Sequence, residues 1–122
     1  MKNEDSFRLI YDEMEKRNKD RAILVGPEVK GEMEVGVITL DCCDCMQRLV
    51  EEEKMTMKKD DVWPYIIGLF LKWGELWEAV RGKSSPIFRL DSAGAVIRLV
   101  ADYDQEFRPP HGDIPFKSMV GG

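Results

Sequence analysis

The feature that most constrains this chain is an apolar segment between residues 62 and 80. At helical spacing, its large side chains cover most of the circumference of a helix, and Lys72, Glu75 and Glu78 leave only a narrow polar stripe. A helix that is apolar nearly all round has to be buried nearly all round. The sequence therefore predicts a helix from about residue 60 to residue 80 that other elements, or another molecule, must cover.

Local signals support the two ends of this helix. Asp60 and Asp61 precede the apolar residues, where acidic side chains favour a helix start. Pro64 is expected in the first turn, where a missing N–H is tolerated, and Gly82 follows as a residue able to end the helix in a left-handed conformation.

Chain length limits what can cover such a helix. The 122 residues and 14.1 kDa match one hydrophobic core, so we expect one domain over residues 1–122, with a Pro- and Gly-rich C-terminal loop or tail over residues 103–122. One sheet covers only one side of a helix, so part of this helix is predicted to contact a partner or a second copy of the chain. The residues predicted for this role are Trp63, Phe70, Trp73 and Trp77. The alternative is a central core helix covered by its own chain.

The rest of the chain predicts an α+β fold of order α-β-β-α-α-β-β. A first helix carries Phe7, Ile10, Tyr11 and Met14 on one face, with Asp5 or Ser6 as its cap. Strands are expected at residues 22–25 and 34–39, a helix capped by Asp41 through about residue 54, and a hairpin of residues 87–90 and 95–101. Two hairpins would then form an antiparallel sheet whose one face is packed with about three helices.

The charge balance limits the class of partner. The chain has 23 acidic and 18 basic side chains, a net charge of −5, which makes direct nucleic-acid binding unfavourable. Acidic residues gather at 41–44, 51–53 and 60–61, and Glu51 and Glu52 are candidate contacts for a protein with a basic surface. The alternative is that these runs are solvated helix faces.

A second hypothesis is a pocket that sequesters a small anionic ligand such as a nucleotide. Its cations and its stacking aromatic would be Arg81, Lys83, Arg89, Arg98, Phe107 and Arg108. The segment 81–85 follows a predicted helix, whereas phosphate loops open one, so cations stabilising a helix end are the competing interpretation.

A third hypothesis is an enzyme that uses His111 or one of the thiols Cys42, Cys43 and Cys45. The thiols point to different sides of the predicted helix and lack a second cysteine pair, so the sequence predicts neither a metal site nor a cofactor. A helix N-terminus lowers a thiol pKa, which leaves a reactive cysteine open. No complete catalytic set accompanies His111, and a non-enzymatic protein is favoured.

The location is expected to be cytoplasmic, without membrane contact. The N-terminal residues lack a secretory signal pattern, the longest apolar run (residues 62–71) is too short to span a bilayer, and the three cysteines are crowded together. These features favour an accessory protein that acts by binding: a protein-interaction or inhibitor module, of a kind that phages and mobile elements often encode, which self-associates as a homodimer.

Overall fold

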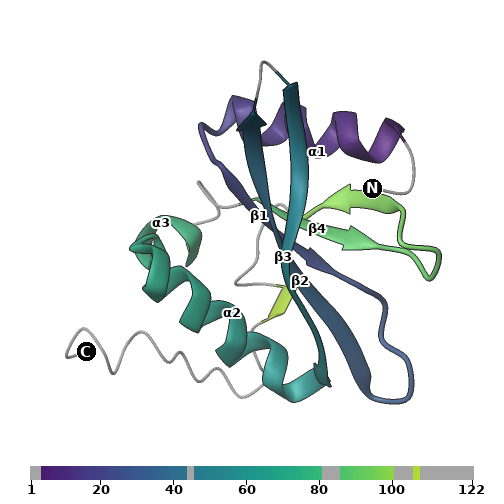
Figure 1. Cartoon of the computed structure of the whole chain (residues 1–122). Helices are drawn as coiled ribbons and strands as arrows, with labels where there is room; N and C mark the ends of the chain where they lie inside the picture. The colour runs from purple at the N-terminus through teal and green to yellow at the C-terminus, as the bar shows by residue number, and fades with distance from the viewer. Residues whose placement is uncertain (1–3, 44–45, 81–85, 101–105, 108–122) are drawn as a thin grey trace.

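The computed structural model describes residues 4–43, 46–80, 86–100 and 106–107, and over these residues the fold is α+β (Figure 1). Five strands form one mixed sheet in the order β3-β2-β1-β4-β5. The elements follow the chain as α1 (Glu4–Lys16), β1 (Arg21–Val25), β2 (Glu32–Cys43), β3 (Met46–Lys58), α2 (Lys59–Trp73), α3 (Leu76–Val80), β4 (Ile87–Leu90) and β5 (Val96–Leu99).

Both predicted hairpin pairings are present. β1 pairs antiparallel with β2, and β4 pairs antiparallel with β5. The two pairs are joined by a parallel contact between β1 and β4, in which Leu24 lies opposite Phe88, so the sheet is mixed rather than antiparallel throughout. In the turn between β4 and β5, Asp91 Oδ1 accepts hydrogen bonds from the N–H groups of Ala93 and Ala95, both at 2.9 Å.

The predicted helix over residues 41–54 is wrong. The described residues of this range, 41–43 and 46–54, end β2 and form most of β3, the partner strands of a long antiparallel pair (Figure 1). The three- and four-residue spacing of Met46, Leu49 and Val50 resembles a helical stripe, but the strand is held by pairing with β2, such as Val35 opposite Met55. Strand formation depends on such cross-strand partners more than on local propensity, and sequence spacing does not reveal them.

The predicted long helix is present but is divided. α2 ends at Trp73 because Gly74 adopts a left-handed conformation with a φ of 72°, and its N–H donates to the Leu71 carbonyl at 3.1 Å. The Glu75 N–H donates to the Phe70 carbonyl at 2.8 Å, which completes a common helix end. Pro64 lies in the second turn of α2 rather than the first, and the predicted end at Gly82 is outside the described residues.

The helices pack on both faces of the sheet rather than on one. α2 contributes six buried residues to the larger core, against the face of β1 and β2 that carries Ile23, Val25 and Val35. α1 buries Ile10 and Met14 against the opposite face. Alternation of side chains along each strand supplies both faces with apolar residues, so each face needs its own cover. No helix among the described residues is long and apolar enough to cross a membrane.

A candidate binding cleft on the sheet

The face of the sheet that packs on α1 is only half covered. Ile10 and Met14 of α1 lie against Ile38 and Phe88, all of them buried. Ser6, in the first turn of α1, accepts a hydrogen bond from the Val96 N–H at 3.1 Å and so attaches α1 to β5. Toward Glu32 and Thr56, the same face is open.

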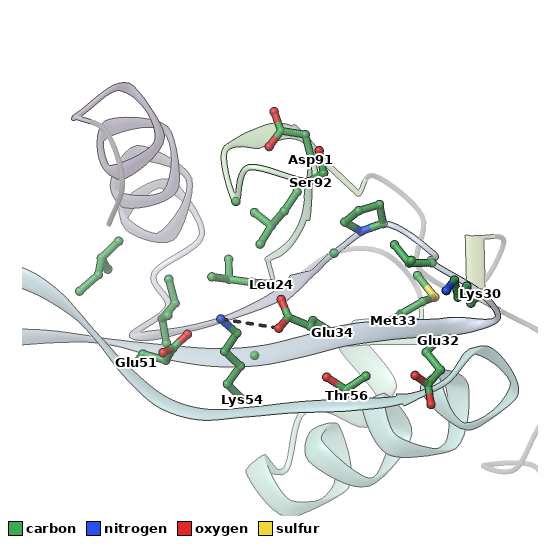
Figure 2. A pocket seen from close by; sticks show the side chains of 18 residues that line it. Leu24, Lys30, Glu32, Met33, Glu34, Glu51, Lys54, Thr56, Asp91 and Ser92 are labelled. Atoms are coloured by element: carbon green, nitrogen blue, oxygen red, sulfur yellow. Dashed lines mark ion pairs between the residues drawn. The ribbon is translucent and has the colours of Figure 1, made fainter.

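A cleft of about 580 Å³ occupies this open half (Figure 2). Leu24, Ile38 and Leu49 contribute apolar side chains from three neighbouring strands. The loop between β1 and β2 and the turn between β4 and β5 complete the lining with Pro27, Val29, Lys30, Asp91, Ser92 and Gly94.

A β-bulge shapes the floor of the cleft. Glu51 pairs with Ile38 and Glu53 pairs with Val37, so Glu52 is the extra residue on β3. Gly36 lies beside the bulge, where an added Cβ would be 3.3 Å from the Glu53 carbonyl oxygen, closer than side chains normally approach. Glycine at this position lets the two strands lie close together.

The bulge also divides the acidic run between the two faces of the sheet. Glu51 lines the cleft, whereas Glu52 and Glu53 line a shallow hollow on the α2 face together with Arg21 and Trp73. The predicted pair Glu51 and Glu52 is therefore exposed, as expected, but the two residues lie on a strand and face different surroundings.

Negative charge predominates in the cleft. Its lining carries four carboxylates, those of Glu32, Glu34, Glu51 and Asp91, and two ammonium groups, those of Lys30 and Lys54. Glu34 and Lys54 form an ion pair of 3.8 Å, with both side chains half exposed (Figure 2). Within the described part of the chain, Glu32 and Glu51 have no ion-pair partner.

The aromatic residues predicted for partner contact separate into buried and exposed groups. Trp63 and Phe70 are 3% and 0% exposed and belong to the core beneath α2, so their own chain covers them. Trp73 is half-buried, with its ring 6.1 Å from the Phe70 ring and the Arg21 guanidinium 5.3 Å above it. Trp77 is 60% exposed. The predicted homodimer stays a prediction, with Trp77 as its most accessible aromatic.

Three residues of the predicted anion pocket do come together. Arg89 and Arg98 lie opposite each other on β4 and β5, and the Arg89 guanidinium lies 5.9 Å from the centre of the Phe107 ring. A carboxylate that the sequence analysis did not consider, Glu106, lies between the arginines. The other predicted residues, Arg81, Lys83 and Arg108, are outside the described residues.

The residues of the enzyme hypothesis cannot be placed together. His111 and Cys45 lie outside the described residues, and only the backbone of Cys42 and Cys43 is described, in β2. Among the described residues, no group of three or more His, Cys, Asp or Glu side chains could hold a metal ion.

Sequence reasoning missed the cleft itself. Its acidic residues Glu32 and Glu34 were visible as the polar positions of an alternating strand, which usually face solvent. Recognising them as a cleft lining required β3 to be identified as the next strand.

Searches against protein-family models, curated proteins and solved structures found no match.

Proposed function

We propose that this protein acts by binding, without catalysis, and that its cleft receives a short basic segment of a protein partner. The observation that carries this proposal is the excess of carboxylates over ammonium groups around an apolar floor. A protein working in this way is an interaction or inhibitor module.

The lining favours an occupant with both positive and apolar side chains. Val29, which is 59% exposed, and the partly buried Leu49 gain when apolar side chains replace water above them. Glu32 and Glu51 attract lysine or arginine, and the low-dielectric sheet behind them strengthens this attraction relative to a flat surface in water. An anionic occupant would be repelled by the same groups.

The size of the cleft sets the length of the segment. A volume of about 580 Å³ lies within the range of sites that hold small molecules, roughly 300–1,000 Å³. It accepts a few side chains of an extended segment rather than a folded domain. The chain's net charge of −5 also favours encounter with a basic protein.

A peptide titration tests this function. The probe is a fluorescent hexapeptide of alternating lysine and leucine, and the control is the same peptide with glutamate in place of lysine. Binding is followed by fluorescence anisotropy and located by amide NMR shifts of the labelled protein. We expect shifts at the cleft residues with the basic peptide, weaker binding at higher salt, and no binding of the acidic peptide.

Two neighbouring glutamates provide matched variants. Glu51→Lys places a positive charge in the cleft and should weaken binding roughly tenfold or more, because like charges in contact cost at least the 1.4 kcal/mol of a tenfold change. Glu52→Lys makes the same charge change on the other face and should have a much smaller effect. Equal weakening by both variants, or amide shifts confined to the α2 face, would contradict the proposal.

A further inference from the structure

Two arginines face each other on the α2 side of the sheet, behind the cleft. Arg89 of β4 and Arg98 of β5 are directly paired across the strands. Like charges placed opposite each other in a sheet are destabilising unless an anion lies between them. The pair therefore needs a negative group at this position.

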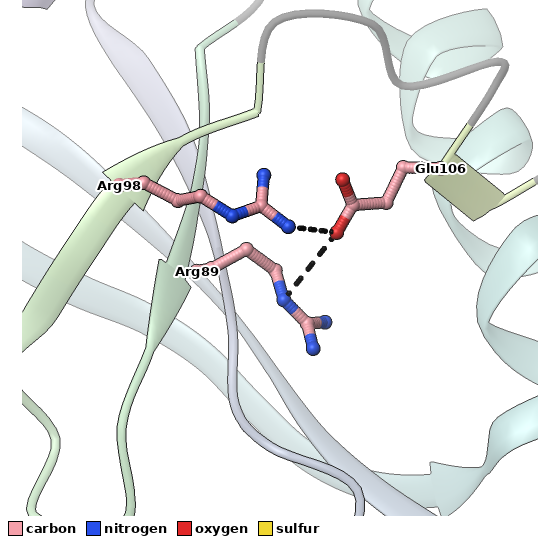
Figure 3. A network of polar contacts seen from close by, with 3 residues as sticks. All are labelled: Arg89, Arg98 and Glu106. Carbon is pink, nitrogen blue, oxygen red and sulfur yellow. Dashed lines mark hydrogen bonds and ion pairs between the residues drawn. The ribbon is translucent and has the colours of Figure 1, made fainter.

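The chain itself supplies one, the carboxylate of Glu106 (Figure 3). A single oxygen, Oε1, is 2.6 Å from an Nη atom of Arg98 and 3.6 Å from Nε of Arg89. One carboxylate thus faces two guanidinium groups, and the cluster keeps a net positive charge.

The Arg89 guanidinium has weaker polar contacts than that of Arg98. The Arg89 side chain is only 19% exposed, and 3.6 Å is too long for a hydrogen bond to Glu106. Within the described residues its guanidinium has no hydrogen bond and contacts the Phe107 ring instead. A guanidinium carries five N–H donors, and withholding them from water without replacing their bonds is costly.

We propose that Arg89 and Arg98 form a binding site for a phosphate group, either free phosphate or a phosphomonoester, and that Glu106 occupies this site when no ligand is bound. A phosphomonoester carries about 1.5 to 2 negative charges at neutral pH and presents three acceptor oxygens. It can therefore balance both cations and bond to each in the forked geometry that suits arginine. Because this site and the cleft lie on opposite faces of the sheet, the proposal does not depend on the peptide-binding function.

Inorganic phosphate is the first probe, added to the full chain at neutral pH and constant ionic strength set with chloride. A ligand of the folded state raises the melting temperature, so about 10 mM phosphate should raise that of the wild type above the chloride control. Titration calorimetry then gives the affinity. A phosphate response no larger than that to chloride, in both the wild type and Glu106→Gln, would overturn the proposal.

Three variants separate a binding site from a simple structural contact. Glu106→Gln removes the competing carboxylate charge and should bind phosphate roughly tenfold more tightly, a change of 1.4 kcal/mol. Arg98→Gln should abolish the response. Glu13→Gln is the matched control, because Glu13 forms a similar half-buried pair of 3.3 Å with one arginine, Arg17, and should respond like the wild type.

If Glu106 were only a structural tether, Glu106→Gln would not bind phosphate more tightly than the wild type, and that result would refute the proposal. An unchanged phosphate affinity in Arg98→Gln would refute it as well. Circular dichroism establishes that each variant is folded, and Arg89→Lys, which keeps the charge but loses the fork, should weaken phosphate binding without abolishing it.

The affinities for adenosine monophosphate and adenosine, compared with that for phosphate, distinguish free phosphate from a phosphomonoester as the ligand. Equal affinity for adenosine monophosphate and phosphate would support a site that recognises the phosphate group alone. Tighter binding of the nucleotide would support a phosphomonoester whose remainder also contacts the protein. Adenosine binding that matches the nucleotide would count against the site.

Discussion

The two faces of the sheet use the same strands but have different degrees of cover. On the α2 face, apolar side chains occur on β1, β2 and β4, and α2 with the start of α3 covers them in one continuous core. On the α1 face, the apolar side chains stop partway along β2 and β3, where Glu34, Lys54 and Thr56 take over. A helix packs stably against a sheet only where it buries apolar surface. The difference leaves part of the α1 face open.

Truncating one large core residue on each face gives the largest expected effect. Phe70 and Phe88 are both 0% exposed, on the α2 and α1 faces respectively. Phe70→Ala should lower the free energy of unfolding by about 3–5 kcal/mol. Phe88→Ala should cost about 1 kcal/mol less, because its neighbours border an open cleft and can relax into it.

Urea denaturation of both variants measures this difference. The slopes of the two transitions should match, so that a shift in midpoint reports stability alone. A larger loss for Phe88→Ala than for Phe70→Ala would show that the α1 face is packed as tightly as the α2 face, and would contradict this prediction.

Two glycines, Gly74 and Gly68, provide a matched test of how the α2 face is covered. Gly74 turns the chain so that Leu76 of α3 packs on the same core as Trp73. Gly74→Ala should destabilise the protein by about 1–2 kcal/mol, because its φ of 72° is unfavourable for a residue with a Cβ.

The same substitution at Gly68 is the control. Gly68 lies exposed within α2, and an added Cβ would have no atom within 4 Å. Gly68→Ala should therefore stabilise the protein by about 0.5–1 kcal/mol through helix propensity. Thermal melts of both variants provide the test. Changes in melting temperature of the same sign for Gly74→Ala and Gly68→Ala would refute the role proposed for Gly74.

A pH-dependent effect is the smallest we expect. Burial, followed by the hydrogen bond and the charge of Glu53, raises the pKa of Tyr65 from 10.0 to about 12, and the hydroxyl donates to Glu53 over 3.0 Å. The folded protein thus holds this proton more tightly than the unfolded chain. The resulting stability is complete below pH 10 and is lost as pH rises from 10 to 12.

Tyr65→Phe should therefore flatten the loss of stability between pH 10 and 12. The difference from the wild type should be below about 1 kcal/mol, because water screens a partly exposed pair. Glu53→Gln should flatten the profile partially, since it removes the charge but keeps an acceptor. Urea midpoints measured across this range provide the test, and parallel profiles for the wild type and Tyr65→Phe would contradict it.

Elements with their own local signals were predictable. Each of these elements has a recognisable pattern within a short stretch of sequence. They are the α1 stripe of Phe7, Ile10 and Met14, the β4–β5 turn at Asp91 and the apolar residues of α2. β3 was not predictable in this way, because its glutamates and methionines suit a helix and its pairing partners lie on β2. The cleft could not be predicted either, because Glu51 and Lys54 become part of its lining only when β3 pairs with β2.

Local sequence patterns were enough to predict an α+β chain with an acidic surface, a nearly all-apolar helix and two antiparallel strand pairs, because periodicity and turn residues act over short distances. Which of these residues are exposed depended on how the elements pack. The tertiary structure buried Trp63 and Phe70, left Trp77 exposed, placed Glu51 in a cleft and brought Arg89, Arg98 and Glu106 together. Those outcomes depend on which strand lies beside which, and contacts between residues far apart in the chain set that order.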